Sequence, residues 1–348
     1  MMKAVACARA LLTGVCLVAL PAFAEDRIEF DSAMYGTETA IQPNFQLLGA
    51  FSADNRTKDV RITATLNIPE DAKGPVAAIV IDHTSGGVGA DVSLLEQAMR
   101  RAGFATLIYE SFVPRNYPRS GDGSGGTKLE LNQVVDAYMA LKALAANPRI
   151  DPKRIYYVGM SAEGNAALLA TIEWIRKRYA DNLQFAGLVA LYPGGYAAPN
   201  AAGMSTETPL LILPAEQDNF MKWSRTKVWL DYVTRENPSL PIKVVMVKDT
   251  QHSFMHPNGA GYNPNTATPN NCPYLLVSER APMAPMLQLD GSVVGYRWDQ
   301  SCVARGATTS YSSSAAAFAI AQIVAFSNGE AARQDSLRST LLKGKKAV

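Results

Sequence analysis

Hydrophobic and polar positions follow a repeated order along the chain, a strand pattern and then a helix pattern. Residues 60–68 place apolar side chains at every second position, the period of a half-buried strand near a sheet edge. From Val76 onward the apolar runs are short and continuous, as in strands covered on both faces. These runs occupy 76–81, 105–109, 155–158, 185–192, 209–213 and 242–247.

Helical spacing separates these strand runs. Apolar residues recur at intervals of three and four in 94–102, 131–141, 166–178, 221–232 and 315–326. Because strands alternate with helices, the pattern predicts an α/β fold with a mostly parallel, doubly wound sheet and helices on both faces. With no internal repeat or low-complexity linker, we expect one large domain from residue 25 to residue 348.

The first 24 residues have a pattern of their own. Lys3 and Arg9 form a short positive region, residues 10–20 are apolar, and residues 22–24 (Ala-Phe-Ala) resemble a cleavage site before Glu25. This order is typical of a secretory signal peptide. A membrane anchor is the alternative, but the apolar run is shorter than the ~20 residues that a spanning helix needs. We expect an exported protein, periplasmic or secreted, with no membrane span in the mature chain.

Removing the leader changes the charge balance. The chain has 33 Lys and Arg against 31 Asp and Glu, and the leader contains two of the cations and no acid, so the mature chain has 31 of each. A neutral surface gives no electrostatic reason to expect a nucleic acid or anionic lipid as a partner. The composition, 48% hydrophobic and 18% charged, excludes intrinsic disorder.

Two cysteines, Cys272 and Cys302, remain in the mature chain. In an oxidising compartment such a pair predicts one disulfide bond, with two buried free thiols as the alternative. Both lie at about 257–310, a segment too long for an ordinary connection and rich in Pro, Asn and aromatic residues. Because long ordered loops are usually functional, we expect this disulfide-containing insertion to form a lid or wall of the active site. A Gly-rich loop at 115–128 is expected at the same rim.

The run 155–158 leads through Gly159, Met160 and Ser161 directly into a helical pattern. This order is close to a nucleophile elbow, a sharp strand-to-helix turn that exposes a serine hydroxyl above the sheet. Gly159 relieves crowding where the chain reverses. The N–H groups at the start of the helix face any negative charge that develops near the serine. A helix-capping role is the alternative for Ser161.

A serine nucleophile needs a base, and an acid must orient that base. In folds with this elbow, the acid and then the histidine follow the serine along the chain. Asp218 lies in the turn after the run 209–213 and is the expected acid. Glu216 on the same turn and Asp249 near the expected base are the alternatives.

The chain contains three histidines, His83, His252 and His256. His252 follows the run 242–247 and stands in the required order, so we expect it to be the base. His256, deeper in a Pro- and Asn-rich loop, is its rival. Three histidines without paired spacing do not indicate a zinc site, and no metal is predicted.

The turn after the first buried strand reads Asp-His-Thr-Ser-Gly-Gly at 82–87. In this architecture one oxyanion-hole amide belongs to the residue after the nucleophile, here Ala162, and the other to this turn. We expect the second amide to be that of Ser85, or of the threonine before it. Gly86 lets the backbone approach a substrate. His83 is either a positioning residue of this turn or a packing histidine.

These features resemble the dienelactone hydrolase family of the α/β-hydrolase superfamily. The resemblance runs through 76–85, through 137–168 with its Asp-Pro-x-Arg-Ile lead-in, and through the turns of the expected acid and base. It implies an α/β-hydrolase fold and a hydrolase of esters or lactones that works without metal or cofactor, through an acyl-enzyme. Family members often carry a cysteine nucleophile, whereas Ser161 is similar to the serine esterase branches. Glu163 replaces the first of two paired glycines, a departure that we expect to affect specificity.

The sequence therefore predicts an exported serine hydrolase that cleaves a small-molecule carboxylic ester or lactone, with no prediction for its oligomeric state. Two alternatives remain. One is a catalytically silent binding protein of the same fold, which Glu163 would favour, and the other is a peptidase.

Overall fold

The computed structural model describes residues 23–35, 56–116, 126–259, 261–277, 285–297 and 299–329 of the 348-residue chain. Residues 1–22 of the expected signal peptide lie outside the described residues, as do residues 117–125 of the expected rim loop. Within the described part, no helix combines the length and the apolar content that crossing a bilayer would require.

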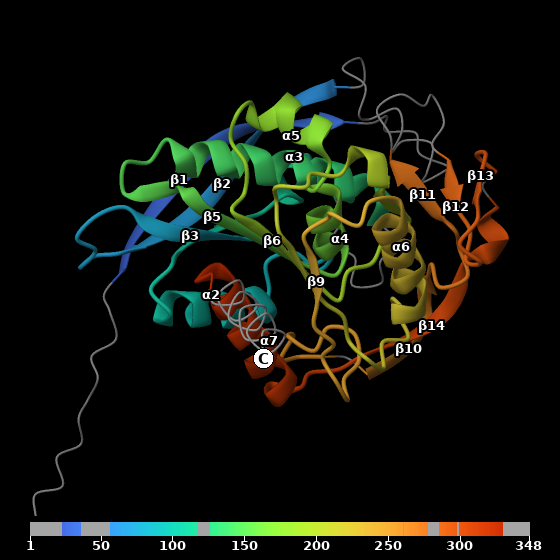
Figure 1. The fold of residues 1–348 in the computed structure, drawn as a ribbon. Coiled ribbons are helices and arrows are strands. Elements are labelled where there is room, and N and C mark those ends of the chain that lie inside the picture. Colours follow the sequence, from blue (N-terminus) through green and yellow to red (C-terminus); the bar gives the residue numbers. More distant parts are fainter. Residues whose placement is uncertain are drawn as a thin grey trace, which may run out of the picture.

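An eight-stranded, mostly parallel sheet forms the centre of the molecule, in the order β1-β2-β4-β3-β5-β6-β8-β9 (Figure 1). The antiparallel part is made by β1, β2 and β4, and the neighbours from β4 to β9 pair in parallel. The strands are β1 (Phe23–Tyr35), β2 (Arg56–Pro69), β3 (Val76–Ile81), β4 (Ala105–Tyr109), β5 (Ile150–Met160), β6 (Gly187–Leu191), β8 (Leu210–Leu213) and β9 (Ile242–Val244). This topology confirms the predicted α/β fold.

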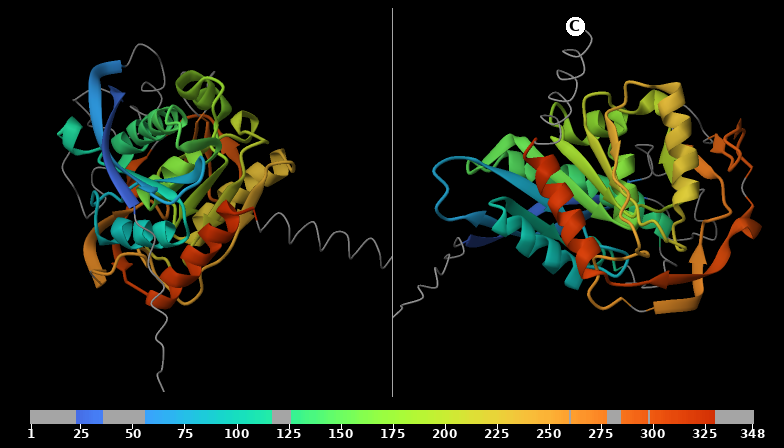
Figure 2. Two further views of the ribbon diagram at one scale, coloured as in Figure 1. Left: turned by 90° about the vertical axis from the view of Figure 1, so that its left-hand side faces the viewer. Right: turned by 60° about the horizontal axis from the view of Figure 1, so that its bottom comes forward.

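Helices cover both faces of the sheet (Figures 1 and 2). The two faces carry separate hydrophobic cores because successive strand residues point in opposite directions. In β5, Ile155 and Tyr157 join one core, and Tyr156 and Val158 join the other. The first core contains side chains of α3 (Gly126–Ala145), α4 (Ala162–Leu169), α5 (Glu173–Ala180) and α6 (Trp223–Glu236), and the second contains those of α2 (Ala90–Arg101) and α7 (Ser313–Ser327).

The expected insertion at about 257–310 forms short strands beside the main sheet. β10 (Gly261–Thr268) pairs with β14 (Ala304–Thr309), and a second small sheet has the order β13-β12-β11-β7. The remaining short elements are β7 (Ala197–Pro199), β11 (Tyr274–Val277), β12 (Met286–Leu287), β13 (Val293–Val294), and the 3₁₀ segments η2 (Val113–Arg115), η3 (Ala201–Gly203) and η4 (Gln300–Cys302).

A disulfide bond joins Cys272 to Cys302 across the insertion. Arg225 of α6 fastens the same region to the body of the protein. Its guanidinium donates to the carbonyl oxygens of Cys272, at 2.9 Å, and Gly195, at 2.7 Å, and lies 3.6 Å from the centre of the Tyr274 ring.

Two sequence-based expectations about helices were wrong. The single helix expected at 166–178 is two helices, α4 and α5, because the Thr171 hydroxyl donates to the Leu168 carbonyl at 2.6 Å and Ile172 takes an extended conformation. The expected loop at 115–128 ends earlier, because α3 begins at Gly126.

The expected position of residues 60–68 near a sheet edge is confirmed, since β2 is the second strand of the sheet. The edge strand itself, β1, pairs with β2 along its full length and was not predicted. The alternation of Ile28 and Phe30 with charged residues matches a strand, yet it lies directly beyond the leader and was not recognised. β5 begins at Ile150, before the predicted start at 155, and β9 ends at Val244 rather than 247.

Candidate active site

The turn between β5 and α4 has the geometry of a nucleophile elbow. Ser161 takes a φ of 60° and a ψ of −116°, a strained conformation for a residue with a side chain. A Cβ atom at Gly159 would lie 1.9 Å from the carbonyl oxygen of Glu163, and one at Gly164 would lie 2.7 Å from that of Leu191. Glycine at these two positions therefore lets the helix start this close to the sheet.

Ser161, His252 and Asp218 form a continuous chain of hydrogen bonds. Ser161 Oγ lies 2.8 Å from His252 Nε2, and His252 Nδ1 lies 2.7 Å from Asp218 Oδ2. The other carboxylate oxygen of Asp218 accepts the backbone N–H groups of Phe220 and Met221, both at 2.8 Å. These bonds hold the carboxylate so that one oxygen faces the imidazole.

The three residues come from loops that follow β5, β8 and β9. These strands are parallel and lie in the order β5-β6-β8-β9, so only β6 separates β5 from the other two. Parallel strands end at the same edge of a sheet, so residues distant in sequence meet there. Ser161 is 7% exposed and His252 is 1% exposed, so the hydrogen-bonded chain is largely shielded from water.

The alternative acids and base have local contacts instead. Glu216 accepts the backbone N–H of Asp249 at 3.1 Å, and Asp249 takes a left-handed φ of 52°. His256 Nδ1 accepts the backbone N–H of Asn258 at 3.1 Å. The side chains of Glu216 and His256 therefore accept backbone N–H groups of these loops and are not part of the hydrogen-bonded chain of Ser161.

Two aromatic rings that sequence reasoning missed enclose the imidazole of His252. Ring centroids of Tyr192 and Phe220 lie 5.0 Å and 4.7 Å from that of His252. Tyr192 follows β6 and Phe220 follows the expected acid, so their positions after strand ends were the available signal. Both rings limit how far the imidazole can rotate.

The insertion contacts the loops of both Asp218 and His252. Thr309 of β14 forms a bridge with His252, and the backbone N–H of Ser310 donates to the His252 carbonyl at 3.1 Å. The backbone N–H of Thr308 donates to the side-chain oxygen of Asn219 at 2.7 Å. The insertion therefore lies against this site, on the side that the lid or wall hypothesis requires.

The turn after β3 is held by the carbonyl of Thr84. This oxygen accepts the backbone N–H of Gly87 and lies near His83 Nδ1, both at 2.8 Å, while the Thr84 hydroxyl accepts the Gly86 N–H at 3.3 Å. On the opposite side, Ala162 is the first residue of α4, and its N–H has no partner within its own helix.

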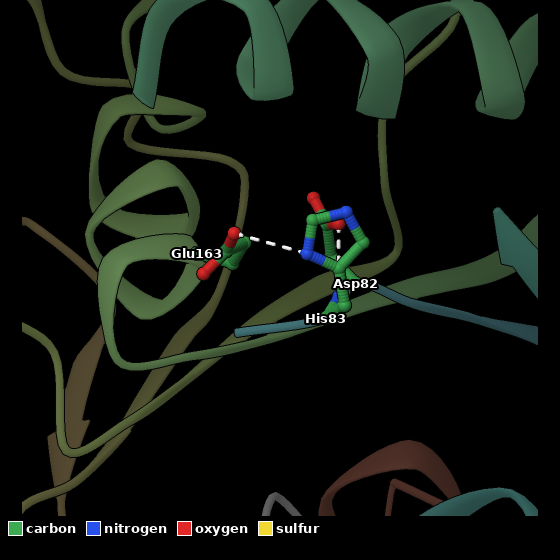
Figure 3. A group of neighbouring side chains, drawn as sticks. All are labelled: Asp82, His83 and Glu163. Carbon is green, nitrogen blue, oxygen red and sulfur yellow. Dashed lines mark hydrogen bonds and ion pairs between the residues drawn. The ribbon is translucent and has the colours of Figure 1, made fainter. Parts of the chain in front are cut away.

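Behind this turn lies a fully buried group of ionisable side chains, Asp82, His83 and Glu163 (Figure 3). His83 Nδ1 lies 3.3 Å from Glu163 Oε1, which also accepts the side-chain amide of Gln133. Asp82 accepts the hydroxyl groups of two tyrosines and the backbone N–H of His83. The sequence predicts Glu163 near the active site, but no local pattern links it with His83, 80 residues earlier.

Burial and mutual attraction shift the pKa values of this group. Burial raises the pKa of Glu163 to about 8 and that of Asp82 to about 6. Burial also lowers the pKa of His83, whereas hydrogen bonding to Glu163 and the charge of Asp82 raise it. Because the backbone N–H of Ser111 donates to His83 Nε2, that nitrogen carries no proton, and near neutral pH the group retains the proton of the Glu163 carboxyl.

Among the residues that the structure describes, these three could hold a metal ion, since their ligand atoms lie within 4.8 Å of one another. Both ring nitrogens of His83 are already engaged, Nδ1 with Thr84 and Nε2 with the backbone N–H of Ser111 at 3.1 Å. Asp82 likewise accepts hydrogen bonds at both oxygens. These contacts fit a hydrogen-bonded network rather than a set of metal ligands.

The sheet, the elbow and the hydrogen-bonded chain are those of an α/β hydrolase. The model of the dienelactone hydrolase family matches residues 62–272, and the chain belongs to that family. No curated protein matches it.

A solved structure shows the same fold at low sequence identity. A dienelactone hydrolase-like promiscuous phosphotriesterase from metagenomic libraries has a TM-score of 0.52 at 15% identity, over 88% of this chain and 98% of that chain. The esterase of the Planctomycetes species Thermogutta terrifontis, solved with butyrate bound, has a TM-score of 0.41 at 15% identity, over 58% of this chain and 82% of that chain.

Proposed function

We propose that this protein is a serine hydrolase that cleaves a small-molecule carboxylic ester or lactone through an acyl-enzyme on Ser161. The observation that carries the proposal is the hydrogen-bonded chain from Ser161 through His252 to Asp218, with the serine on a strained elbow. A weakly nucleophilic hydroxyl becomes reactive when a base at this distance takes its proton.

In the proposed reaction, Ser161 Oγ attacks the substrate carbonyl while its proton passes to His252 Nε2. Asp218 keeps the proton of the resting imidazole on Nδ1 and stabilises the imidazolium that forms. The amides of Ala162 and Ser85 bind the oxyanion. His252 then protonates the leaving alcohol, and a water molecule activated by the same histidine releases the acid.

The alternative of a catalytically silent binding protein was favoured by Glu163, whose charge could repel an oxyanion. The carboxyl group of Glu163 is fully buried and contacts His83 and Gln133. Because this carboxyl group is buried and faces these two side chains, its position supports a hydrolase over a binding protein.

Covalent labelling tests the proposal. The mature protein is treated with a fluorophosphonate, and we expect one adduct on the peptide that contains Ser161. Ser161→Ala, shown to be folded by circular dichroism, is the control and takes no label. Absence of labelling in the folded wild type would refute the serine hydrolase and favour the binding protein.

Nitrophenyl esters of short and long acyl groups, a lactone and a matched anilide then define the substrate class. We expect ester and lactone turnover that His252→Ala abolishes, since no other histidine contacts Ser161 among the described residues. Faster cleavage of the anilide than of the esters would instead identify a peptidase.

We also propose that residues 1–24 direct export and are removed. Cleavage after Ala24 would trim the first two residues of β1 and leave Glu25–Tyr35 paired with β2. The full-length chain is expressed in a bacterium with a periplasm, and the masses of the periplasmic and secreted protein are measured. A mass that begins at Glu25 supports export, and an uncleaved cytoplasmic protein contradicts it.

A further inference from the structure

His83 lies where the loops after three neighbouring strands meet. Its Nδ1 is 2.8 Å from the carbonyl oxygen of Thr84 in the turn after β3. The same nitrogen is 3.3 Å from Glu163 Oε1, beyond β5. Its Nε2 is 3.1 Å from the backbone nitrogen of Ser111, after β4. One fully buried imidazole therefore joins three loops at the edge of the sheet that carries Ser161.

The contacts of His83 favour one tautomer. Glu110 Oε1 lies 3.3 Å from Nε2, but this oxygen already accepts the backbone N–H of Phe112 at 3.1 Å. The backbone N–H of Ser111 can only donate, so Nε2 accepts this bond with its lone pair. The ring proton is then on Nδ1, where the Thr84 carbonyl and the Glu163 carboxyl group are both acceptors. Glu163 thus stabilises the tautomer that lets His83 donate to the Thr84 carbonyl.

The Thr84 carbonyl determines the direction of the next amide. A trans peptide is planar, and its C=O and N–H bonds point in opposite directions. The carbonyl accepts two hydrogen bonds at 2.8 Å, from His83 and from the backbone N–H of Gly87. Holding this oxygen therefore fixes the direction of the Ser85 N–H, one of the two proposed oxyanion donors.

The other proposed donor is the N–H of Ala162, which directly precedes Glu163 in α4. A contact between Glu163 and His83 consequently connects the helix that carries one amide to the turn that carries the other.

We propose that Glu163, acting through His83, is a positioning residue that holds the two halves of the oxyanion hole in register. This inference rests on the proposed serine hydrolase function and extends it. It gives a physical role to the glutamate that replaces a family glycine. Because burial raises the pKa of Glu163 to about 8, its carboxyl group adds little negative charge beside the oxyanion near neutral pH.

Two substitutions of Glu163, to side chains of similar size, test whether the residue acts by positioning His83 or only by filling space. Glu163→Gln keeps an oxygen that can accept from both His83 and Gln133, and its NH₂ group takes the place of Oε2, which has no hydrogen-bond partner among the described residues. Glu163→Met fills the space without a comparable acceptor. Glu173→Ala, in the first turn of α5 and 32% exposed at its side chain, is the matched control.

We expect Glu163→Met to lower kcat for an ester about 10- to 100-fold, somewhat less than the loss of a whole oxyanion donor, with KM changed by less than about threefold. The kcat of Glu163→Gln is expected to stay within about fivefold of the wild-type value. The kcat of Glu173→Ala is expected to equal the wild-type value. Unchanged kcat in a folded Glu163→Met, or equal losses in the Met and Gln variants, would overturn the proposal.

A double-mutant cycle tests the route through His83. If Glu163 acts through this residue, His83→Ala combined with Glu163→Met loses no more activity than His83→Ala alone. Fully additive losses would show that Glu163 acts by another route and would overturn the inference.

Amide NMR provides a readout that does not depend on catalysis. In Glu163→Met we expect the ¹H–¹⁵N signal of Ser85 to shift, while Glu163→Gln leaves it near the wild-type position. An unchanged Ser85 signal in the Met variant overturns the positioning role even if the wild type is inactive. A wild type that neither turns over esters nor takes the fluorophosphonate label, but shows the shift, refutes only the serine hydrolase.

Discussion

Replacing Gly159 with alanine should damage the candidate site without touching any of its reacting groups. The new Cβ would lie 1.9 Å from the carbonyl oxygen and 2.4 Å from the carbonyl carbon of Glu163, and 3.0 Å from the nitrogen of Gly164. Ordinary contact begins near 3.4 Å. The first turn of α4 must therefore move about 1.5 Å from β5. Because the obstacles are backbone atoms, no side-chain rotation relieves them.

This displacement has consequences for stability and for activity. Overpacking of this kind costs about 1–3 kcal/mol, and we expect the upper end because backbone has to move. A shift of about 1 Å in a catalytic group lowers rates on the order of 100-fold, so ester turnover should fall at least that far.

Urea denaturation and nitrophenyl ester kinetics measure the two effects of Gly159→Ala. Gly74→Ala is the matched control, because a Cβ at Gly74 meets nothing within 4 Å, and it should change neither quantity by much. If Gly159→Ala folds with wild-type stability and turns over esters at the wild-type rate, the described elbow geometry is wrong.

Three further predictions concern the acid, the disulfide and the buried pair. Asp218→Asn should lower kcat for an ester on the order of 10⁴-fold, as the corresponding change does in a serine protease triad. The reason is that the new NH₂ group faces either the imidazole of His252 or the two backbone N–H donors. Ester kinetics measure the loss. Replacing Cys272 and Cys302 with serine should lower the free energy of unfolding by about 3–4 kcal/mol, the chain-entropy value for a separation of 30 residues. Urea denaturation measures this change, and an unchanged midpoint would contradict it. In the buried pair of Glu163 and His83, burial raises the folded-state pKa of Glu163 to about 8, so the folded protein holds a proton there that the unfolded chain releases. The stability from Glu163 is lost as pH rises from about 4.5 to 8, and Glu163→Gln should flatten this decline in denaturation midpoints.

Chain order and strand ends were sufficient to predict the central sheet and the meeting of Ser161, Asp218 and His252. Buried parallel strands have continuous apolar runs, so β3, β4, β5, β6 and β8 are visible in the sequence, and their carboxyl ends share one edge. The family assignment followed from the same residues, and the match over 62–272 confirms it.

Other features depend on contacts that no local pattern records. The break between α4 and α5 is hidden because apolar spacing continues through it, while the hydrogen bond of the Thr171 hydroxyl ends the first helix. β1 alternates like a strand, but only its pairing with β2 fixes its place in the sheet. His83 and Glu163 become neighbours because β3 and β5 pair in parallel, so their contact could not be predicted from sequence spacing.

The strained conformation of Ser161 is maintained mainly by the last residue of β6 and the three residues that follow it. The Ser161 N–H donates to the Leu191 carbonyl at 3.0 Å, and the Ser161 carbonyl accepts the N–H groups of Gly194, at 3.2 Å, and Asn165, at 3.1 Å. Backbone strain persists only where surrounding contacts over-determine it. Two of these three bonds come from residues 191–194, which also include Tyr192, the ring beside His252. The same four-residue segment thus fixes the backbone of Ser161 and limits rotation of the His252 ring. The distance between Ser161 Oγ and His252 Nε2 therefore depends on the end of β6, although this strand supplies none of the three hydrogen-bonded side chains.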